Sequence, residues 1–188
     1  MSQKTIGLFV GSLRKESFSR KIALSVAGML TPRFEARLVE LGGLALYNQD
    51  FDDSGSPPPA WTAFRSEVKA LDAFLFVTPE YNRCPPAVLK NALDIGSRPY
   101  GQSVWDGKPG GVISVSPGKL GGFGANHGLR QAVVFLNIFM MPQPEAYIGG
   151  VANILGADGT VADAGTRDFL RAYTDAFAAW IGKFEING

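Results

Sequence analysis

The chain has 188 residues, a formal net charge of +1 and a single cysteine. This length suits one domain with a full core, so we expect a single domain over residues 1–188. Basic and acidic residues are interspersed, and nucleic-acid binding, which needs a clustered basic face, is excluded. One cysteine cannot form an internal disulfide, which is compatible with a reducing cytoplasm.

The sequence also argues against a membrane span, a signal peptide and a metal site built on paired histidines or a Cys/His cluster. No apolar run approaches the roughly 20 residues of a membrane helix. The N-terminal residues MSQKT lack a basic region followed by an apolar core, so we expect no signal peptide and a cytoplasmic location. His127 is the only histidine, and no Cys/His cluster has zinc-ligand spacing.

The first predicted element is a strand over residues 4–10, which stops at Gly11. A loop rich in hydroxyls follows, and a helix is predicted over 18–30 from apolar residues at spacings of three and four. Free N–H groups at a helix N-terminus favour an anion, and a guanidinium adds charge-assisted bonds to a phosphate. The polar residues of this candidate phosphate loop are Ser12, Arg14, Ser17 and Ser19. The alternative is an ordinary strand–helix turn with an N-cap serine.

Two other phosphate loops are excluded. No G-x-G-x-x-G follows the first strand, which argues against a dinucleotide-binding Rossmann start. No G-x-x-x-x-G-K-[ST] occurs, because Gly118-Lys119 is followed by Leu120.

Strand and helix patterns alternate along the rest of the chain, which predicts an α/β fold with a parallel sheet and helices on both faces. A long segment over 41–58 shows no regular pattern and is either a lid or an exposed connection. The last helix carries an aromatic stripe that favours core packing. The remaining strands are expected at 34–40, 73–78, 110–116 and 144–148, and the remaining helices at 59–71, 87–96, 123–140 and 165–184.

Three loops of unusual composition leave strand C-termini, at 11–19, 79–86 and 116–124. In open parallel sheets a ligand binds beyond this edge, so we expect the three loops to form one crevice. The second loop is bounded by prolines and carries Tyr81, whose ring supplies a flat wall. Glycines in the third loop, SPGKLGGFG, allow a flat ligand to approach the backbone.

The motifs GSLRKESFS, TPEYN followed by LKNALD, and SPG-x-x-GG together resemble the NADPH-dependent FMN reductase family. Within it, the chain is most similar to bacterial chromate and quinone reductases, from about residue 5 to the C-terminal helix. The resemblance implies a flavodoxin-like three-layer sandwich, with a five-stranded parallel sheet of order 2-1-3-4-5. It also implies non-covalent FMN, with NADPH or NADH as co-substrate.

The resemblance assigns residues to parts of the cofactor. By the resemblance, the first loop would bind the FMN phosphate, and the isoalloxazine ring would lie between the second and third loops. The cofactor-binding residues so implied are Ser12, Arg14, Ser17, Phe18 and Ser19, then Pro79, Glu80, Tyr81 and Asn82, then Ser116, Gly118, Gly121 and Gly122.

No obligate catalytic side chain is predicted, because the flavin carries the chemistry and the protein orients it. Cys84 is interpreted as a small packing residue rather than a redox partner. His127 is interpreted as a surface or capping side chain rather than a proton donor.

The predicted function is an FMN-dependent NAD(P)H oxidoreductase that passes hydride through flavin N5 to a small-molecule acceptor. Candidate acceptors are quinones, chromate, ferric complexes, azo compounds and free flavin. The alternative is a flavodoxin-like electron carrier without steady-state turnover. The near-zero net charge and Arg14 argue against that alternative, because such carriers are usually strongly acidic.

A homodimer or homotetramer is also predicted. Between residues 132 and 141 only Asn137 is polar, and a helix apolar on every side must be covered on every side. Either a second copy covers the outer face, or the C-terminal helix or the 41–58 segment does. The resemblance adds that Arg130 and Glu145 match positions of inter-subunit polar contacts in related chromate reductases.

Overall fold

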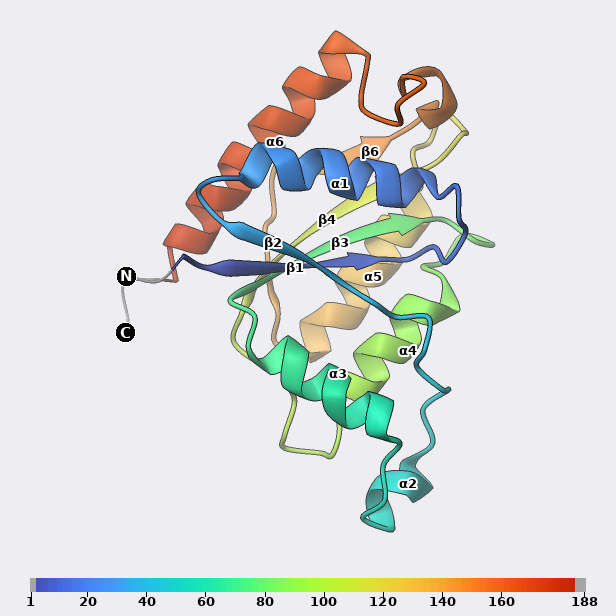
Figure 1. Ribbon diagram of the computed structural model, residues 1–188, viewed down its shortest axis with the longest axis vertical. Helices are drawn as coiled ribbons and strands as arrows, with labels where there is room; N and C mark the ends of the chain where they lie inside the picture. The colour runs from blue at the N-terminus through green and yellow to red at the C-terminus, as the bar shows by residue number, and fades with distance from the viewer. Residues whose placement is uncertain (1–2, 185–188) are drawn as a thin grey trace.

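The computed structural model describes residues 3–184; residues 1–2 and 185–188 of the predicted domain lie outside the described part. Its sheet has the order β2-β1-β3-β4, with two short strands beside β4, and all the pairings are parallel. The parallel sheet and the order of its strands are as expected for a flavodoxin-like fold (Figure 1). The strands are β1 (Thr5–Val10), β2 (Glu35–Val39), β3 (Ala73–Pro79), β4 (Pro109–Val115), β5 (Phe139–Met140) and β6 (Ala146–Ile148).

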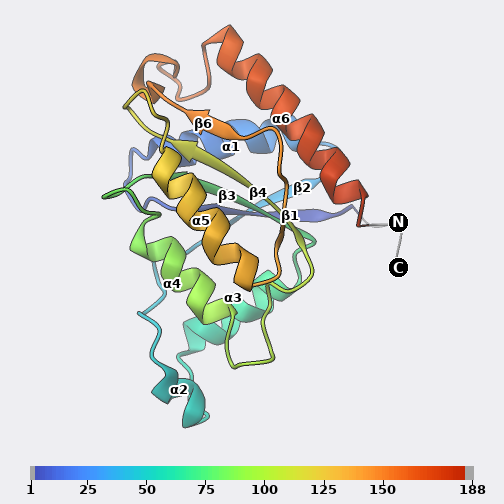
Figure 2. The ribbon, with the colours of Figure 1, turned by 180° about the vertical axis from the view of Figure 1, so that it is seen from behind.

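Helices cover both faces of the sheet, as Figures 1 and 2 show. α1 (Phe18–Leu30) and α6 (Ala164–Gly182) lie on one face. α3 (Pro59–Lys69), α4 (Ala87–Gly96) and α5 (Phe123–Phe135) lie on the other, and the short α2 (Gln49–Asp53) projects at one end. A single 3-10 turn (Val151–Asn153) precedes α6.

The alternation of side chains along the central strands divides the core in two. Leu8 of β1 and its β3 partner Leu75 belong to the cluster under α1 and α6. Phe9 and its partner Phe76 belong to the cluster under α3, α4 and α5, where both pack against Trp105. Because both faces of these strands are buried, their sequences are nearly continuous apolar runs.

The expected helix over 123–140 is wrong in its last turn. α5 ends at Phe135, and Asn137 then takes a left-handed conformation with φ of 54°. Asparagine tolerates that conformation better than most residues, and its side-chain Nδ2 donates to Asp106 Oδ1 at 2.9 Å. The chain then forms β5 beside Gly110 of β4. The fifth strand position is therefore shared by β5 and β6, rather than filled by one strand at 144–148.

The 41–58 segment is neither patternless nor loosely attached. It contains α2, and the side chain of Asn91 in α4 bonds to its backbone at three points. Arg65 of α3 binds Asp52 of α2 through two bonds of 2.8 and 2.7 Å. These two side chains are only 13% and 5% exposed, so the pair fixes α2 against α3. The structure thus supports an anchored connection and not a free lid.

Candidate functional site

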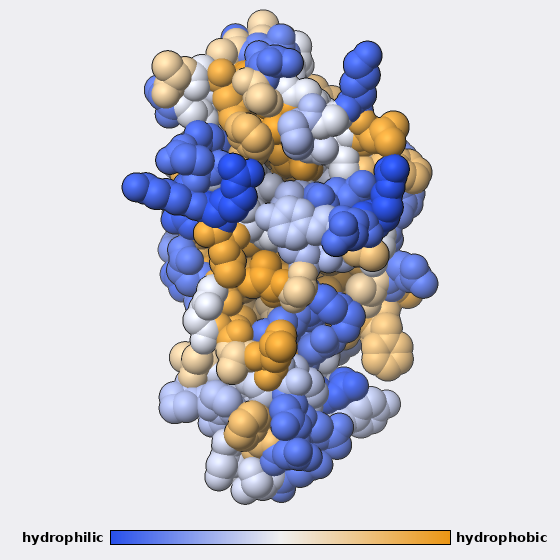
Figure 3. Space-filling view, turned by 90° about the vertical axis from the view of Figure 1, so that its right-hand side faces the viewer, coloured by the Kyte–Doolittle hydropathy of each residue, from blue (hydrophilic) through white to orange (hydrophobic). Residues whose placement is uncertain are grey.

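The three loops predicted to form a crevice lie side by side at the carboxyl edge of β1, β3 and β4, which are neighbours in the sheet. Gly11 at the end of β1 donates its N–H to Val77 O of β3, and Ser116 after β4 donates to Ile148 O of β6. Figure 3 looks onto this edge, where apolar patches lie among strongly hydrophilic side chains. The edge therefore offers both kinds of surface that a flat, phosphate-bearing ligand needs.

The first loop and the start of α1 contain backbone N–H donors and an arginine side chain that have no hydrogen-bond partner among the described residues. The Oγ of Ser17 caps α1 by accepting from Arg20 N at 3.1 Å. The next amides, those of Phe18 and Ser19, have no hydrogen-bond partner within residues 3–184, and the first turn of α1 has no acidic residue. Arg14 is exposed and forms no ion pair with any described residue. Unpaired amides at the positive end of a helix, with an arginine in the loop that leads into it, fit a phosphate dianion.

The serines of this loop differ in how they face solvent. Ser12 is partly exposed, and its Oγ accepts from Arg14 N at 3.4 Å. Ser17 and Ser19 are both buried, and Ser19 lies on the core face of α1 together with Ile22. The N-cap serine that the alternative interpretation of this loop expects is present, and it is Ser17. Contact of Ser17 and Ser19 with a phosphate stays a prediction.

The second loop is a rigid hairpin. Tyr81 and Cys84 exchange two backbone hydrogen bonds of 3.0 Å, and Asn82 and Arg83 between them both have positive φ, of 52° and 67°. Two positive values at the central positions are the pattern of a type I′ turn. The hairpin leaves Tyr81 47% exposed at the edge of the sheet, where its ring is available to a flat ligand.

Glu80 holds the second loop against α5. Its carboxylate accepts from the backbone N–H of Ala125 at 2.9 Å, in the first turn of α5, and lies 3.7 Å from Arg83 Nη1. A carboxylate at a helix N-terminus is favoured by the helix dipole. The carboxylate of Glu80 is thus engaged in positioning the loop.

The glycines of the third loop differ in whether the fold itself requires the absence of a side chain. Gly121 and Gly122 have φ of 61° and 78°, and a Cβ on Gly121 would lie 2.6 Å from the carbonyl carbon of Tyr147. Gly118 has an open face, because the nearest atom to its would-be Cβ is Ser116 Oγ at 3.4 Å. Gly121 and Gly122 are therefore required by the fold itself, whereas Gly118 leaves room for a ligand.

The structure brings three aromatic side chains together beside the third loop, which the sequence did not predict. The ring of His127 lies 4.2 Å from that of Phe123, and its Nε2 is 2.9 Å from Tyr147 Oη. Burial, with a hydrogen bond to the Glu145 carboxylate, raises the pKa of Tyr147 to about 12. Tyr147 lies 20 residues from His127 in the chain, so only the pairing of β6 with β4 reveals the contact. His127 is exposed, as its surface interpretation requires.

The interpretation of Cys84 as a packing residue is wrong. The hairpin exposes Cys84 instead of burying it.

Arg130 and Glu145, which the resemblance places near an interface between subunits, approach each other within one chain. The distance between Arg130 Nε and Glu145 Oε1 is 4.0 Å.

Neither a metal centre nor a membrane span is found in the described part of the chain. Residues 3–184 contain no group of three or more His, Cys, Asp or Glu side chains arranged to hold a metal ion. Among the described helices, none combines the length and apolar character needed to cross a bilayer.

A parallel sheet of this order, with an anion loop after β1 and rigid loops after β3 and β4, defines a flavodoxin-like protein. The residues present fit FMN, because unpaired amides and Arg14 match a terminal phosphate and the open face of Gly118 and the Tyr81 ring match a flat heterocycle.

Comparison with known proteins gives the family. The model for NADPH-dependent FMN reductases matches residues 5–153. A quinone reductase of Pseudomonas putida is 52% identical over 94% of both chains, and a 2-hydroxy-1,4-benzoquinone reductase of a Burkholderia species is 43% identical over 94% of this chain and 95% of that one. FerB of Paracoccus denitrificans, a flavoenzyme NAD(P)H:(acceptor) oxidoreductase, superposes with a TM-score of 0.90 at 40% identity, over 96% of this chain and 98% of FerB. The chain belongs to the NADPH-dependent FMN reductase family. It is an oxidoreductase that uses FMN and NAD(P)H.

Proposed function

We propose that this enzyme is an NAD(P)H:quinone reductase. The observation that carries the proposal is the convergence of an anion loop, an exposed aromatic wall and an open glycine face at one edge of the sheet. The quinone reductases at 52% and 43% identity over nearly the whole chain support quinones as acceptors. Chromate, ferric complexes, azo compounds and free flavin are further candidate acceptors for an open site of this kind. A cytoplasmic location, where NAD(P)H is available, is part of the proposal.

In this proposal FMN supplies hydride acceptance and release, and the chain's own residues bind and orient. Arg14, Ser12 and the first amides of α1 hold the phosphate through charge-assisted hydrogen bonds. Pro79, Glu80, Tyr81 and Asn82 border one edge of the ring, and Ser116, Gly118, Gly121 and Gly122 border another. The Glu80–Ala125 bond fixes the distance between the second loop and α5. No side chain is assigned as a proton acceptor.

The cofactor assignment is tested at Arg14. Replacing Arg14 with Ala should weaken FMN binding by about 1.5–3 kcal/mol, the range for hydrogen bonds to charged groups, and should leave riboflavin binding nearly unchanged. Arg33→Ala is the matched control, because Arg33 is an exposed arginine paired with Asp175. Equal losses for FMN and riboflavin would show that Arg14 does not bind the phosphate.

The acceptor is tested by steady-state oxidation of NAD(P)H with benzoquinone, chromate, a ferric complex, an azo dye and free FMN. We expect the highest kcat/KM with the quinone. If the FMN-loaded protein oxidises NAD(P)H with none of them, the electron-carrier alternative replaces the enzyme.

We also propose that the protein forms a homodimer or homotetramer. The end of α5 leaves Val134 74% exposed and Phe135 76% exposed, so neither α6 nor the 41–58 segment covers them. Exposed apolar patches of this kind favour self-association. Arg130 and Glu145 are proposed to lie near the interface. Sedimentation of the FMN-bound protein at micromolar concentration tests this, and a single species near 20.1 kDa would refute it.

A further inference from the structure

A polar groove lies between the phosphate loop, which forms one of its walls, and the end of β2. Its volume is about 300 Å³, and its walls come from Val10, residues 12–15, Arg20 and residues 38–41. Pockets for small molecules span roughly 300–1,000 Å³. The groove is therefore large enough for one end of a dinucleotide but not for the whole molecule.

Positive charge dominates the groove. Arg14, Lys15 and Arg20 line it, opposed by one carboxylate, Glu40. Arg20 Nη1 is 3.4 Å from Glu40 Oε1, and both side chains remain largely exposed, at 43% and 73%. Lys15 has no ion pair with any residue in the part of the chain that the structure describes. An anion that enters the groove meets a net positive field even with Glu40 in place.

Apolar surface lies beside the cations. Leu13 is 62% exposed although it stands in a polar loop, and Val39 and Leu41 form a buried floor. A ligand that is only an inorganic anion would make no favourable apolar contact with Leu13. A ligand with a flat base next to a phosphate uses both surfaces, because the base packs on Leu13 while the phosphate meets Lys15 and Arg20.

The position of the groove relates it to the reaction. The flavin ring is assigned to the loops after β3 and β4, and the groove lies between β1 and β2. β2 and β4 are three strand spacings apart, or about 14 Å at ~4.8 Å per spacing. A dinucleotide that places its nicotinamide on the flavin and runs along the carboxyl edge of the sheet brings its adenosine end to this groove.

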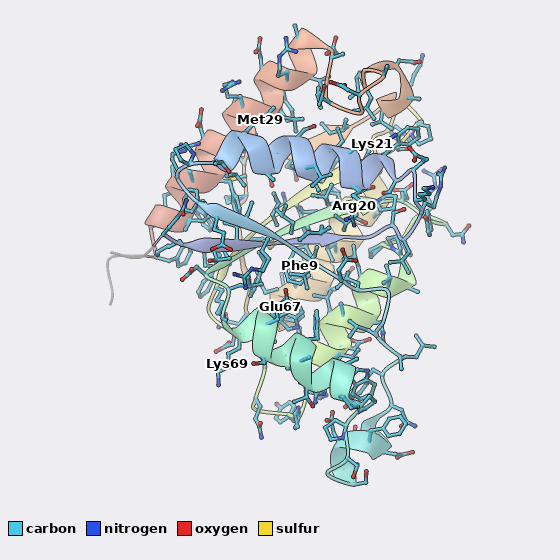
Figure 4. The ribbon with its side chains drawn as sticks, in the orientation of Figure 1. Phe9, Arg20, Lys21, Met29, Glu67 and Lys69 are labelled. Carbon is cyan, nitrogen blue, oxygen red and sulfur yellow. The ribbon has the colours of Figure 1, made fainter. Side chains whose placement is uncertain are left out.

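We infer that the groove binds the adenosine end of NADPH, with the 2′-phosphate on Lys15 and Arg20. This inference rests on the proposed function and adds a preference for NADPH over NADH. Arg14 lines the groove and also belongs to the phosphate loop. Figure 4 shows Arg20 on the side of α1 that faces the sheet, whereas its neighbour Lys21 lies away from it. Lys21 pairs with Glu16 at 2.8 Å and does not line the groove.

The first test compares kcat/KM for NADPH and NADH in the FMN-loaded wild type, Lys15→Gln and Arg20→Gln, with Lys21→Gln as the matched control. We expect the NADPH/NADH ratio to fall about tenfold in the first two variants, through KM, which corresponds to about 1.4 kcal/mol. The control should keep the wild-type ratio. Glu40→Gln should raise kcat/KM for NADPH, since it removes the like charge beside the phosphate.

The second test measures binding without turnover. Isothermal titration of the FMN-loaded wild type should show adenosine 2′,5′-bisphosphate binding about tenfold more tightly than AMP, and Lys15→Gln should abolish that difference. Equal binding of the two nucleotides, or the same NADPH/NADH ratio in all the lysine and arginine variants, overturns the inference. A fall in kcat/KM for NADH in Glu40→Gln with no effect of Lys15→Gln also overturns it, because Glu40 then binds the 2′-hydroxyl of NADH. If the wild type oxidises neither nucleotide, the proposed function fails, and the titration still decides what the groove binds.

Discussion

Asn91 of α4 offers the sharpest test of how the structure holds its 41–58 segment. Its side chain is 7% exposed. Its Oδ1 accepts from Tyr47 N at 2.8 Å, and its Nδ2 donates to Leu44 O at 3.3 Å and to Ala45 O at 3.1 Å. Each such bond contributes about 0.5–1.5 kcal/mol net, and a buried group left without a partner costs about 1–3 kcal/mol. Asn91→Ala should therefore lower the free energy of unfolding by about 2–4 kcal/mol.

The assay is urea unfolding of the FMN-free protein, with thermal unfolding beside it. For a domain of this size, 1 kcal/mol shifts Tm by about 2–4 °C, so we expect a fall of roughly 4–16 °C. Lys90→Ala is the control, since Lys90 forms an exposed pair with Asp94 and its loss should cost less than about 0.5 kcal/mol. Asn91→Asp keeps the acceptor for Tyr47 N but turns a buried carboxylate oxygen toward Leu44 O and Ala45 O, so it should cost at least as much as Asn91→Ala. A loss below about 0.5 kcal/mol in Asn91→Ala would refute the reasoning, because the segment would then be held by other contacts.

Three further predictions follow from the site and from α6. If nicotinamide and acceptor use the same face of the flavin, double-reciprocal plots at several quinone concentrations should be parallel, and intersecting lines would show that both bind together. Gly121→Ala should destabilise the FMN-free protein, because its Cβ would meet the Tyr147 backbone. Gly118→Ala should instead weaken FMN binding, with little change in the stability of the FMN-free protein. The reverse pattern would contradict the different roles of the two glycines. Hydrogen bonding to Thr166 N lowers the pKa of the α6 N-cap Asp163 below its ordinary 3.8, so the carboxylate's contribution is full above that pH and is lost as the pH falls through the native pKa. Asp163→Asn should therefore be less stable than the wild type at pH 7, and the difference should shrink as the pH falls through the native pKa of Asp163; a difference that is constant with pH would be inconsistent with this.

The sequence by itself determined the parallel sheet and the edge of the sheet at which the three loops meet. Both follow from local patterns: apolar runs such as residues 6–10 report strands covered on both faces, and a polar turn after such a run reports the carboxyl edge. An N-cap serine in the first loop could be predicted for the same reason, since a cap bonds to an amide three residues away, and the structure identifies it as Ser17. The family resemblance added the cofactor, because motifs in three loops matched in order.

The tertiary structure decided what depends on partners distant in the chain. The apolar stretch 132–141 reads as one helix, but pairing of Phe139 with Pro109 at the sheet edge turns it into a strand after Asn137. Asn91 lies in a motif that suggested the site, yet its bonds go to residues 44–47. Lys15 and Glu40 meet in one groove only because β2 lies beside β1. A sequence pattern reports which face of an element is buried, whereas packing selects the residue that it meets, and that selection depends on the whole fold.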